Sequence, residues 1–265
     1  TTTRAESFGQ LKQMADEGSL PEQGGELRDI SVWISDLENY TTLSEIYAPT
    51  ELVKVLNSVY TVMGDKVEEH GGFVAQFVGD AMVAAFGAPM DDPNHADNAV
   101  RSALACQEVV AELQKEMTLP EGLRLHNRIG ISTGKLLAGN IGSKSRLSYT
   151  ILGDDINLAS RLEGVNKVYG SSVLVNEVTK QGCGDDLRFR EVDIVRVKGR
   201  NAPVRIFEPL PMNVRLSAED EEDLERYAEA LAVFREGHFA DSAAMFGALS
   251  NRDPVAAAMA GRRQE

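Results

Sequence analysis

The sequence predicts an α+β fold: a ferredoxin-like, palm-like split βαβ sheet with helices on one face, plus a small C-terminal helical hairpin. Three observations predict it. Residues 29–36 alternate apolar with polar side chains, which is typical of a strand buried mainly on one side. Over 49–70 and 94–117, apolar residues recur at helical spacing. Gly79-Asp80 separates two short apolar runs, which favours a hairpin turn between them.

The predicted elements follow the order β-α-β-β-α-β. The strand 29–36 leads to the helix 49–70, which has Pro49 in its first turn and stops at Gly71-Gly72. The hairpin and the second long helix come next. Further strands are predicted near 123–133, 135–139 and 149–152, followed by a helix over 155–168 and then, as far as Leu210, by short strands and one short helix near Asn176.

Changes in composition divide the chain into three parts. Residues 1–27 are polar and contain Gly24-Gly25, which predicts an N-terminal helical stub and a linker. Residues 28–210 form the main domain. In 211–265, apolar residues at helical spacing are interrupted at Gly237, which predicts a helical extension made of a single tetratricopeptide-like hairpin. One such unit cannot bury its own apolar face, so we expect it to dock on the main domain or on a partner.

The composition excludes several classes of protein. Of the 265 residues, 43% are apolar and 26% are charged, which is an ordinary globular mixture. The net charge of −14 disfavours nucleic acids and anionic membranes as partners. No apolar run approaches the about 20 residues that a membrane-spanning helix needs. Two cysteines cannot build a disulfide framework or a structural zinc site, and we expect a cytoplasmic location.

Two aspartates stand out by their positions. Asp36 ends the first buried strand, and Asp80 lies in the hairpin turn. In a split βαβ sheet the first strand lies beside the hairpin, so both carboxylates are expected at one edge. Close carboxylates repel unless a cation lies between them, and paired oxygen ligands suit magnesium together with substrate phosphates. The spacing alone favours a simpler interpretation, in which Asp36 caps the next segment and Asp80 serves its turn.

Five sequence blocks decide between these interpretations. They are residues 29–45 (DISVWISDLENYTTLSE), 71–89 (GGFVAQFVGDAMVAAFGAP), 128–143 (RIGISTGKLLAGNIGS), 149–163 (YTILGDDINLASRLE) and 197–200 (VKGR). Their order and spacing resemble class III nucleotide cyclases. The resemblance covers about residues 28–210 and implies that this part is a cyclase catalytic domain. It also implies a helical extension after that domain, as many bacterial members have.

The resemblance assigns Asp36 and Asp80 as the ligands of two Mg²⁺ (or Mn²⁺) ions. It also implies a loop whose backbone N–H groups bind the terminal phosphates, made of Leu37, Glu38, Asn39, Tyr40 and Thr41. The family usually has Gly and Phe in place of Asn39 and Tyr40. Asn tolerates unusual backbone angles almost as well as Gly, and Tyr keeps the aromatic ring, so we expect the loop to keep its shape.

Four basic or amide residues complete the implied catalytic set. By resemblance, Asn157 positions the ribose, and Arg161 stabilises the charge that develops on the α-phosphate. The two lie one helical turn apart and therefore on one face. Lys198 matches a lysine that contacts the β- and γ-phosphates. Arg146 is a weaker phosphate ligand in this alignment, because its loop can be aligned in more than one way.

Base recognition is where the chain departs from the family pattern. Adenylate-specific members commonly have Lys at the position of Gln76 and Asp or Thr at that of Thr150. Guanylate-specific members commonly pair Glu with Cys or another small residue. Thr150 fits the adenine pattern, while Gln76 fits neither pattern. A glutamine amide offers both a donor and an acceptor, so it can match an edge of either base. We expect ATP as the substrate, and GTP stays open.

The resemblance therefore implies an adenylate cyclase that forms 3′,5′-cyclic AMP and pyrophosphate by in-line attack of the ribose 3′-hydroxyl. In the family, one protomer supplies the metal ligands and the other supplies the base, Asn and Arg residues. One chain here carries both sets, which implies a head-to-tail homodimer with two equivalent sites. The chain begins with Thr, so we expect a longer protein with an upstream sensor domain, and a membrane tether on that protein stays open.

Three alternatives remain at this stage. The first is a guanylate cyclase with the same mechanism. The second is a catalytically weak cyclase-like module that dimerises or senses a nucleotide, which the intact catalytic positions disfavour. The third is a scaffold that acts through the C-terminal helices. A diguanylate cyclase is disfavoured because the chain lacks that family's signature turn.

Overall fold

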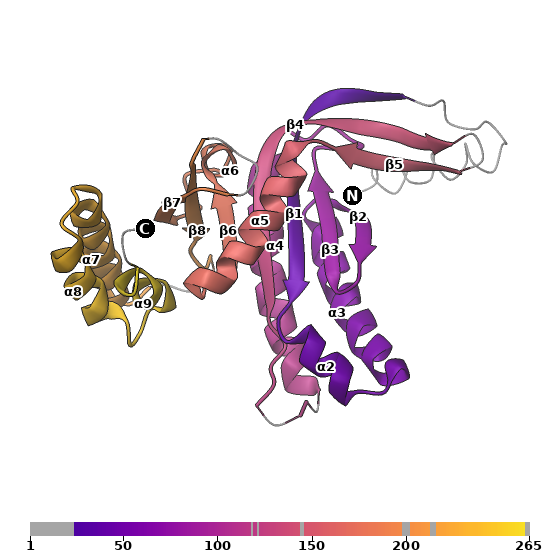
Figure 1. Ribbon diagram of the computed structural model, residues 1–265. Coiled ribbons are helices and arrows are strands. Elements are labelled where there is room, and N and C mark those ends of the chain that lie inside the picture. Colours follow the sequence, from indigo (N-terminus) through magenta and orange to yellow (C-terminus); the bar gives the residue numbers. More distant parts are fainter. Residues whose placement is uncertain are drawn as a thin grey trace.

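Figure 1 shows the computed structural model, which describes residues 24–117, 119–120, 122–143, 146–197, 202–212 and 216–262. Its sheet has eight strands in the order β2-β3-β1-β4-β6-β8-β7, and β5 pairs with β4 outside this path. The strands are β1 (Gly24–Leu37), β2 (Phe73–Val78), β3 (Ala81–Phe86), β4 (Asn127–Ser143), β5 (Arg146–Leu152), β6 (Val173–Asn176), β7 (Phe189–Val195) and β8 (Val204–Pro209). The run β2-β3-β1-β4 has the strand order of a split βαβ sheet, so the predicted α+β fold is confirmed.

The helices of the described ranges complete this architecture. They are α2 (Tyr40–Ile46), α3 (Pro49–Glu69), α4 (His95–Glu116), α5 (Asp154–Tyr169), α6 (Glu177–Gln181), α7 (Ala218–Arg235), α8 (Phe239–Leu249) and α9 (Pro254–Ala260). Helices α3 and α4 cover one face of the central strands, as predicted, and α5 crosses the opposite face (Figure 1). None of these helices is long and apolar enough to span a membrane.

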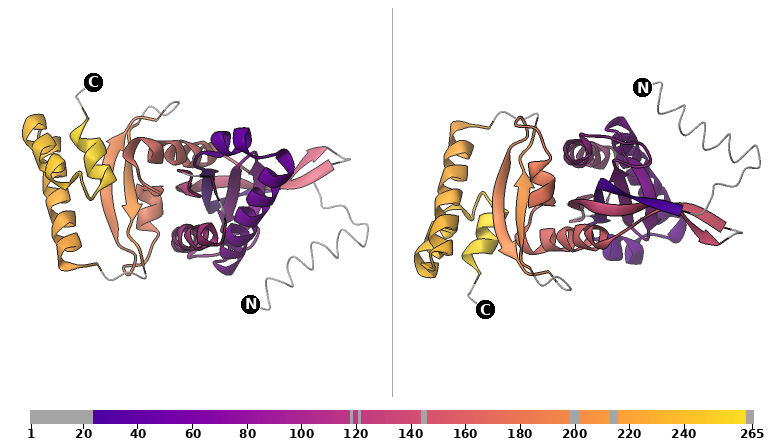
Figure 2. Two further views of the ribbon diagram at one scale, coloured as in Figure 1. Left: turned by 90° about the horizontal axis from the view of Figure 1, so that it is seen from below. Right: turned by 90° about the horizontal axis from the view of Figure 1, so that it is seen from above.

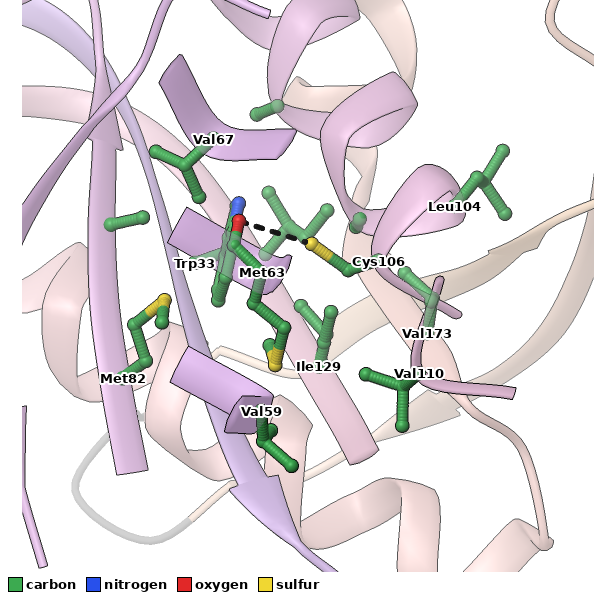
Figure 3. Close-up of a cluster of buried hydrophobic side chains, with 14 of the residues drawn as sticks. Trp33, Val59, Met63, Val67, Met82, Leu104, Cys106, Val110, Ile129 and Val173 are labelled. Carbon is green, nitrogen blue, oxygen red and sulfur yellow. Dashed lines mark hydrogen bonds between the residues drawn. The ribbon is translucent and has the colours of Figure 1, made fainter. Parts of the chain in front are cut away.

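The main core lies between the sheet and helices α3 and α4. Trp33 of β1 is completely buried there beside Met63 and Ile129 (Figure 3). Cys106 of α4 points into this cluster, and its thiol donates a weak hydrogen bond to the Met63 carbonyl at 3.7 Å. Burial raises the pKa of Cys106 to about 12, so the thiol is a packing group rather than a nucleophile.

Strands β1 and β4 are longer than the sequence indicated. β4 is one continuous strand, where two strands with a break near Gly134 were predicted, and that prediction is wrong. β1 already begins at Gly24 because it pairs with β4 along its whole length, so residues 24–27 are strand rather than linker. A Cβ at Gly139 would lie 2.1 Å from the Gly24 carbonyl oxygen, so this close pairing requires glycine. The rest of the predicted stub and linker, residues 1–23, lies outside the described residues.

Helix α5 packs unusually close to β4. A Cβ at Gly130 would lie 2.1 Å from the carbonyl oxygen of Ala159, so only glycine allows the helix backbone to approach the strand this closely. At the first turn of α5, the Ser132 hydroxyl donates to Asp155 at 2.8 Å. The helix that carries two of the predicted catalytic residues is therefore fixed directly on the central strands.

The C-terminal helices dock on the end of the sheet formed by β7 and β8 (Figure 2). They share one apolar core with α5 and the sheet, in which Leu162 and Ile206 lie with Tyr227, Phe246 and Met259. The expectation that this unit would dock on the main domain is confirmed. The helix α9 follows the predicted hairpin and begins at Pro254 with the Asp253 side chain as its N-cap, so the extension has three helices in the described residues.

Candidate active site

The structure brings the two predicted metal ligands together. Asp36 lies near the end of β1, and Asp80 lies in the turn between β2 and β3. Because β1 pairs with β3, with Ser35 opposite Met82, the two aspartates become neighbours. A side-chain hydrogen bond links their carboxyl groups. Burial, followed by the hydrogen bond with Asp36 and its negative charge, raises the pKa of Asp80 to about 6.

This pair fits a divalent cation. Two half-buried carboxyl groups face each other, and in the described parts of the chain no third acidic, histidine or cysteine side chain joins them in a closed metal cage. Mg²⁺ is typically bound by one or two carboxylates and keeps its remaining positions for water and substrate phosphates. A cation between Asp36 and Asp80 would also offset the repulsion that, after burial, contributes to the raised pKa of Asp80.

Arg128 is a third charged residue of this cluster, and the sequence analysis missed it. It lies in β4 directly opposite Asp36, and its Nη2 donates to Asp36 Oδ2 at 2.8 Å. Its Nε donates to Glu163 of α5 at 3.3 Å. The pairing becomes visible only when the register between β1 and β4 is known.

The predicted phosphate loop connects β1 to α2. Asn39 has φ 64°, in the left-handed region that non-glycine residues rarely adopt, and its carbonyl accepts from the Leu43 N–H to start α2. Asn39 therefore adopts the kind of unusual backbone angle that asparagine was expected to tolerate at this position. Glu38 turns its carboxylate toward His126 at 3.1 Å and Arg124 at 3.3 Å. The first N–H groups of α2, which begins at Tyr40, have no carbonyl partner within the helix.

Tyr60 of α3 supports the turn that carries Asp80. Its hydroxyl donates to the Gly79 carbonyl at 2.6 Å, and its ring packs on Phe77 with centroids 4.5 Å apart. Burial, with a smaller contribution from the charge of Asp80, raises the pKa of Tyr60 to about 12. Sequence analysis missed this residue because its spacing on α3 marks it only as part of a helix.

Asn157 and Arg161 project from the same face of α5, one turn apart. Asn157 is exposed, and Arg161 is half-buried. The Nη1 atom of Arg161 is buried and has no hydrogen-bond partner among the described residues. A buried guanidinium nitrogen without a partner is expected where an anion binds. Within the described chain, no hydrogen bond or ion pair joins Asn157 or Arg161 to the aspartate pair.

The two predicted base-contacting residues come from β2 and β5, which pair with different strands of the sheet. Gln76 is exposed on β2, just after an irregularity in the pairing with β3. Thr150 lies on β5 opposite Gly139, and its hydroxyl donates to the Ser148 carbonyl at 3.2 Å. The strands β2 and β5 contact each other through the rings of Phe73 and Tyr149, 5.9 Å apart.

Two predicted phosphate ligands cannot be placed. Lys198 lies outside the described residues, and of Arg146 only the backbone, at the start of β5, is described.

A palm-like sheet with paired aspartates at its hairpin, and a helix bearing an amide and an unpaired guanidinium on the opposite face, defines a nucleotide cyclase domain. The chain belongs to the adenylate and guanylate cyclase catalytic domain family, whose profile matches residues 23–207. The expectation drawn from the five sequence blocks is thereby confirmed.

Known relatives include both kinds of cyclase. Adenylate cyclase 1 of Rhizobium meliloti is 38% identical over 184 residues, which cover 68% of this chain and 27% of that protein. The crystal structure of the adenylyl cyclase CyaB from P. aeruginosa is 29% identical, with a TM-score of 0.64 and coverage of 75% of this chain and 99% of that chain. The guanylyl cyclase Cya2 is 32% identical, with a TM-score of 0.64 and coverage of 74% and 100%. The chain thus spans about a quarter of the curated relative, and the fold alone does not choose the base.

Proposed function

We propose that the protein is an adenylate cyclase, which converts ATP into 3′,5′-cyclic AMP and pyrophosphate. The observation that carries this proposal is the pairing of Asp36 and Asp80 in a sheet of the cyclase type. Two like charges held side by side destabilise a fold, and the ion pair with Arg128 is made by Asp36 and not by Asp80, so a purely structural role gives no reason for the pair.

In this proposal, Asp36 and Asp80 hold two Mg²⁺ or Mn²⁺ ions. When bound, such ions neutralise the triphosphate and favour loss of the proton from the ribose 3′-hydroxyl. The backbone N–H groups of residues 37–41 bind the terminal phosphates, at the start of α2. Lys198 adds positive charge at the β- and γ-phosphates, and Arg146, at the start of β5, is a second phosphate ligand.

Asn157 and Arg161 act on the reacting atoms. Asn157 orients the ribose so that its 3′-oxygen lies in line with the α-phosphorus. The new bond forms between these two atoms while the bond to the pyrophosphate oxygen breaks. The buried Nη1 of Arg161 donates to the α-phosphate oxygen on which charge develops.

The two halves of the site belong to different protomers of a homodimer in this proposal. Support comes from the apolar surface of the catalytic unit, where Leu27 of β1 is 71% exposed and Phe77 of β2 is 50% exposed. Large exposed apolar side chains on these strands favour coverage by a second copy. A head-to-tail arrangement would place Asp36 and Asp80 of one chain opposite Asn157 and Arg161 of the other.

ATP is the proposed nucleotide because Thr150 fits the adenine pattern and the Rhizobium meliloti relative is an adenylate cyclase. GTP is the second candidate, because Gln76 can match either base and Cya2 is a guanylyl cyclase. Purified protein should be given ATP and GTP side by side with Mg²⁺ or Mn²⁺, and the products identified by mass spectrometry. Cyclic AMP as the main product is expected. Cyclic GMP as the sole product would favour the second candidate, and no cyclic product would favour a regulatory module.

The shared site is tested by mixing inactive chains. Asp36→Ala and Arg161→Ala should each abolish activity, because each removes one half of both sites. Co-refolded at equal amounts, they should recover up to about a quarter of the wild-type rate, since half of the dimers are mixed and each has one intact site. Mixed dimers as inactive as both parents would contradict the shared-site arrangement.

A further inference from the structure

The guanidinium of Arg128 joins a proposed metal ligand to the helix of the proposed transition-state residues. It is 11% exposed and lies between β1 and α5. Nη2 donates to Asp36 Oδ2 at 2.8 Å, and Nε donates to Glu163 Oε1 at 3.3 Å. Nη1 lies 4.0 Å from Glu38 Oε1, at the start of the phosphate loop. One side chain therefore contacts three segments that the proposed reaction uses.

We propose that Arg128 is a positioning residue, which orients the Asp36 carboxylate for a divalent cation and holds α5 in register with it. This inference rests on the proposed metal-binding role of Asp36. The planar guanidinium presents its N–H donors in a rigid fork, so it can bond two carboxylates in fixed directions at once. A lysine ammonium at the same place keeps the charge but not the fork.

The link to Asp36 acts on the metal ligand itself. Side chains that hydrogen-bond a metal-binding carboxylate fix its orientation, and their loss typically lowers metal affinity or activity by about 10- to 100-fold. With Oδ2 held by Arg128, the carboxyl group of Asp36 cannot rotate freely. The positive charge also offsets part of the repulsion between Asp36 and its neighbours Asp80 and Glu163, so the carboxylates can stay close before a cation arrives.

The link to Glu163 acts on α5. Glu163 is two residues beyond Arg161 and is 15% exposed, facing β4. Gly130, two residues beyond Arg128 on the same face of β4, allows the close approach of α5. Arg128 thus fixes the segment of α5 that carries Arg161. Since Asp36 and Arg161 of one chain would serve different sites of the dimer, this one ion-pair cluster contributes to both sites.

Arg190 offers a matched control at the β7 edge of the sheet. It lies in β7 directly opposite Glu208 of β8, as Arg128 lies opposite Asp36. Its guanidinium is 15% exposed and bridges Glu208 and Asp253, the N-cap of α9, with one Nη2–Oδ1 distance of 3.0 Å. The two arginines therefore share the same construction, but only Arg128 contacts a proposed metal ligand.

The experiment compares Arg128→Lys with Arg190→Lys. Mn²⁺ binding is measured by electron paramagnetic resonance in the presence of 3′-deoxy-ATP, which cannot cyclise, and kcat and KM are measured separately with ATP. Both variants lose a bridging guanidinium, so both should unfold at a lower temperature than the wild type. Arg128→Lys should in addition weaken Mn²⁺ binding by about 10-fold and lower kcat. Arg190→Lys should leave Mn²⁺ binding unchanged. Equal Mn²⁺ binding in Arg128→Lys and the wild type, or equal weakening in both variants, would overturn the proposal.

Glu163→Gln separates the two links of Arg128. This variant keeps the contact with Asp36 and weakens the one with α5, so kcat should fall while Mn²⁺ affinity stays near the wild-type value. A loss of Mn²⁺ affinity as large as in Arg128→Lys would contradict the separate roles.

Two failures can be told apart. Wild-type protein that shows neither Asp36-dependent Mn²⁺ binding nor a cyclic product would overturn the proposed function. If the wild type is active and Arg128→Lys has wild-type Mn²⁺ binding and kcat, only the role of Arg128 is overturned.

Discussion

The arginine clusters around Arg128, on the central strands, and around Arg190, at the β7 edge of the sheet, are built alike and differ in how their carboxylates are paired. At the C-terminal end, Arg190 faces Glu208 and Asp253, and it lies over the Tyr227 ring at 5.0 Å. Burial acts to lower the pKa of Arg190, but the two carboxylates outweigh it and the pKa is raised. Each charge has a partner, and the cluster fastens α9 to the sheet.

The cluster around Arg128 has a surplus of negative charge. Arg128 meets Asp36 and Glu163, while Asp80 lies beside Asp36 without an arginine of its own. Burial and the neighbouring aspartate raise the pKa of Asp80 to about 6, and burial raises that of Glu163. The difference indicates that a cluster in which every carboxylate is ion-paired with the arginine stabilises a contact, whereas a cluster that also holds a carboxylate outside these ion pairs is prepared for a cation.

The largest effect is expected from Asp80→Ala. The rate of cyclic nucleotide formation should fall by about 1000-fold, because about 4 kcal/mol of charge stabilisation at the metal site is lost. The metal-free protein should not be destabilised, since the substitution removes a repulsion. Steady-state kinetics and denaturant unfolding measure the two quantities. An Asp80→Ala protein that is less stable than the wild type but fully active would contradict the functional role of this cluster.

The opposite behaviour is expected from Asp253→Ala. It leaves a buried guanidinium with one partner fewer, so the free energy of unfolding should fall by about 3 kcal/mol. The value of kcat at 25 °C should stay close to that of the wild type, because this cluster contacts no proposed catalytic residue. Urea unfolding and kinetics on the same preparation test it. If Asp253→Ala keeps its stability but loses most of its kcat, the structural role assigned to the Arg190 cluster is wrong.

The stability gained on ligand binding should depend on the cluster that holds Asp80 and not on the cluster that holds Asp253. With Mg²⁺ and 3′-deoxy-ATP at about 100 times the dissociation constant, wild-type protein should gain about 2.7 kcal/mol of stability. Asp253→Ala should gain as much, and Asp80→Ala should gain little. Thermal unfolding with and without ligand measures this gain. An equal shift in all three proteins would place the ligand away from Asp80.

The smallest effect is expected from Tyr60→Phe. It removes the hydrogen bond to the Gly79 carbonyl beneath the Asp80 turn, which contributes about 1 kcal/mol. Stability should fall by that amount and kcat by a few-fold, because the ring still packs on Phe77. Urea unfolding and steady-state kinetics with ATP measure the two changes. Loss of activity as large as in Asp80→Ala would mean that the hydroxyl itself takes part in the reaction.

The sequence was sufficient to predict the pairing of Asp36 with Asp80, because strand order alone brings a central strand beside a hairpin. The roles of Arg128 and Arg190 depend on register and on where α5 and α9 pack, which no local pattern reveals. The break predicted in β4 is absent because Gly134 lies under the Asp155 side chain, where a Cβ would be 2.0 Å from the carboxylate. That glycine serves a close approach rather than a turn. Helix α9 was missed because its seven residues are all apolar and mostly small, so no alternation of polar and apolar residues indicates a helix.

The central claim is that Asp36 and Asp80 hold divalent cations against a nucleoside triphosphate. A crystal structure with Mn²⁺ and 3′-deoxy-ATP tests it most directly, because anomalous scattering locates the manganese. We predict manganese between the carboxylates of Asp36 and Asp80, with Arg161 of the partner subunit at the α-phosphate. Manganese bound elsewhere, with the two carboxylates uncoordinated, would contradict the account.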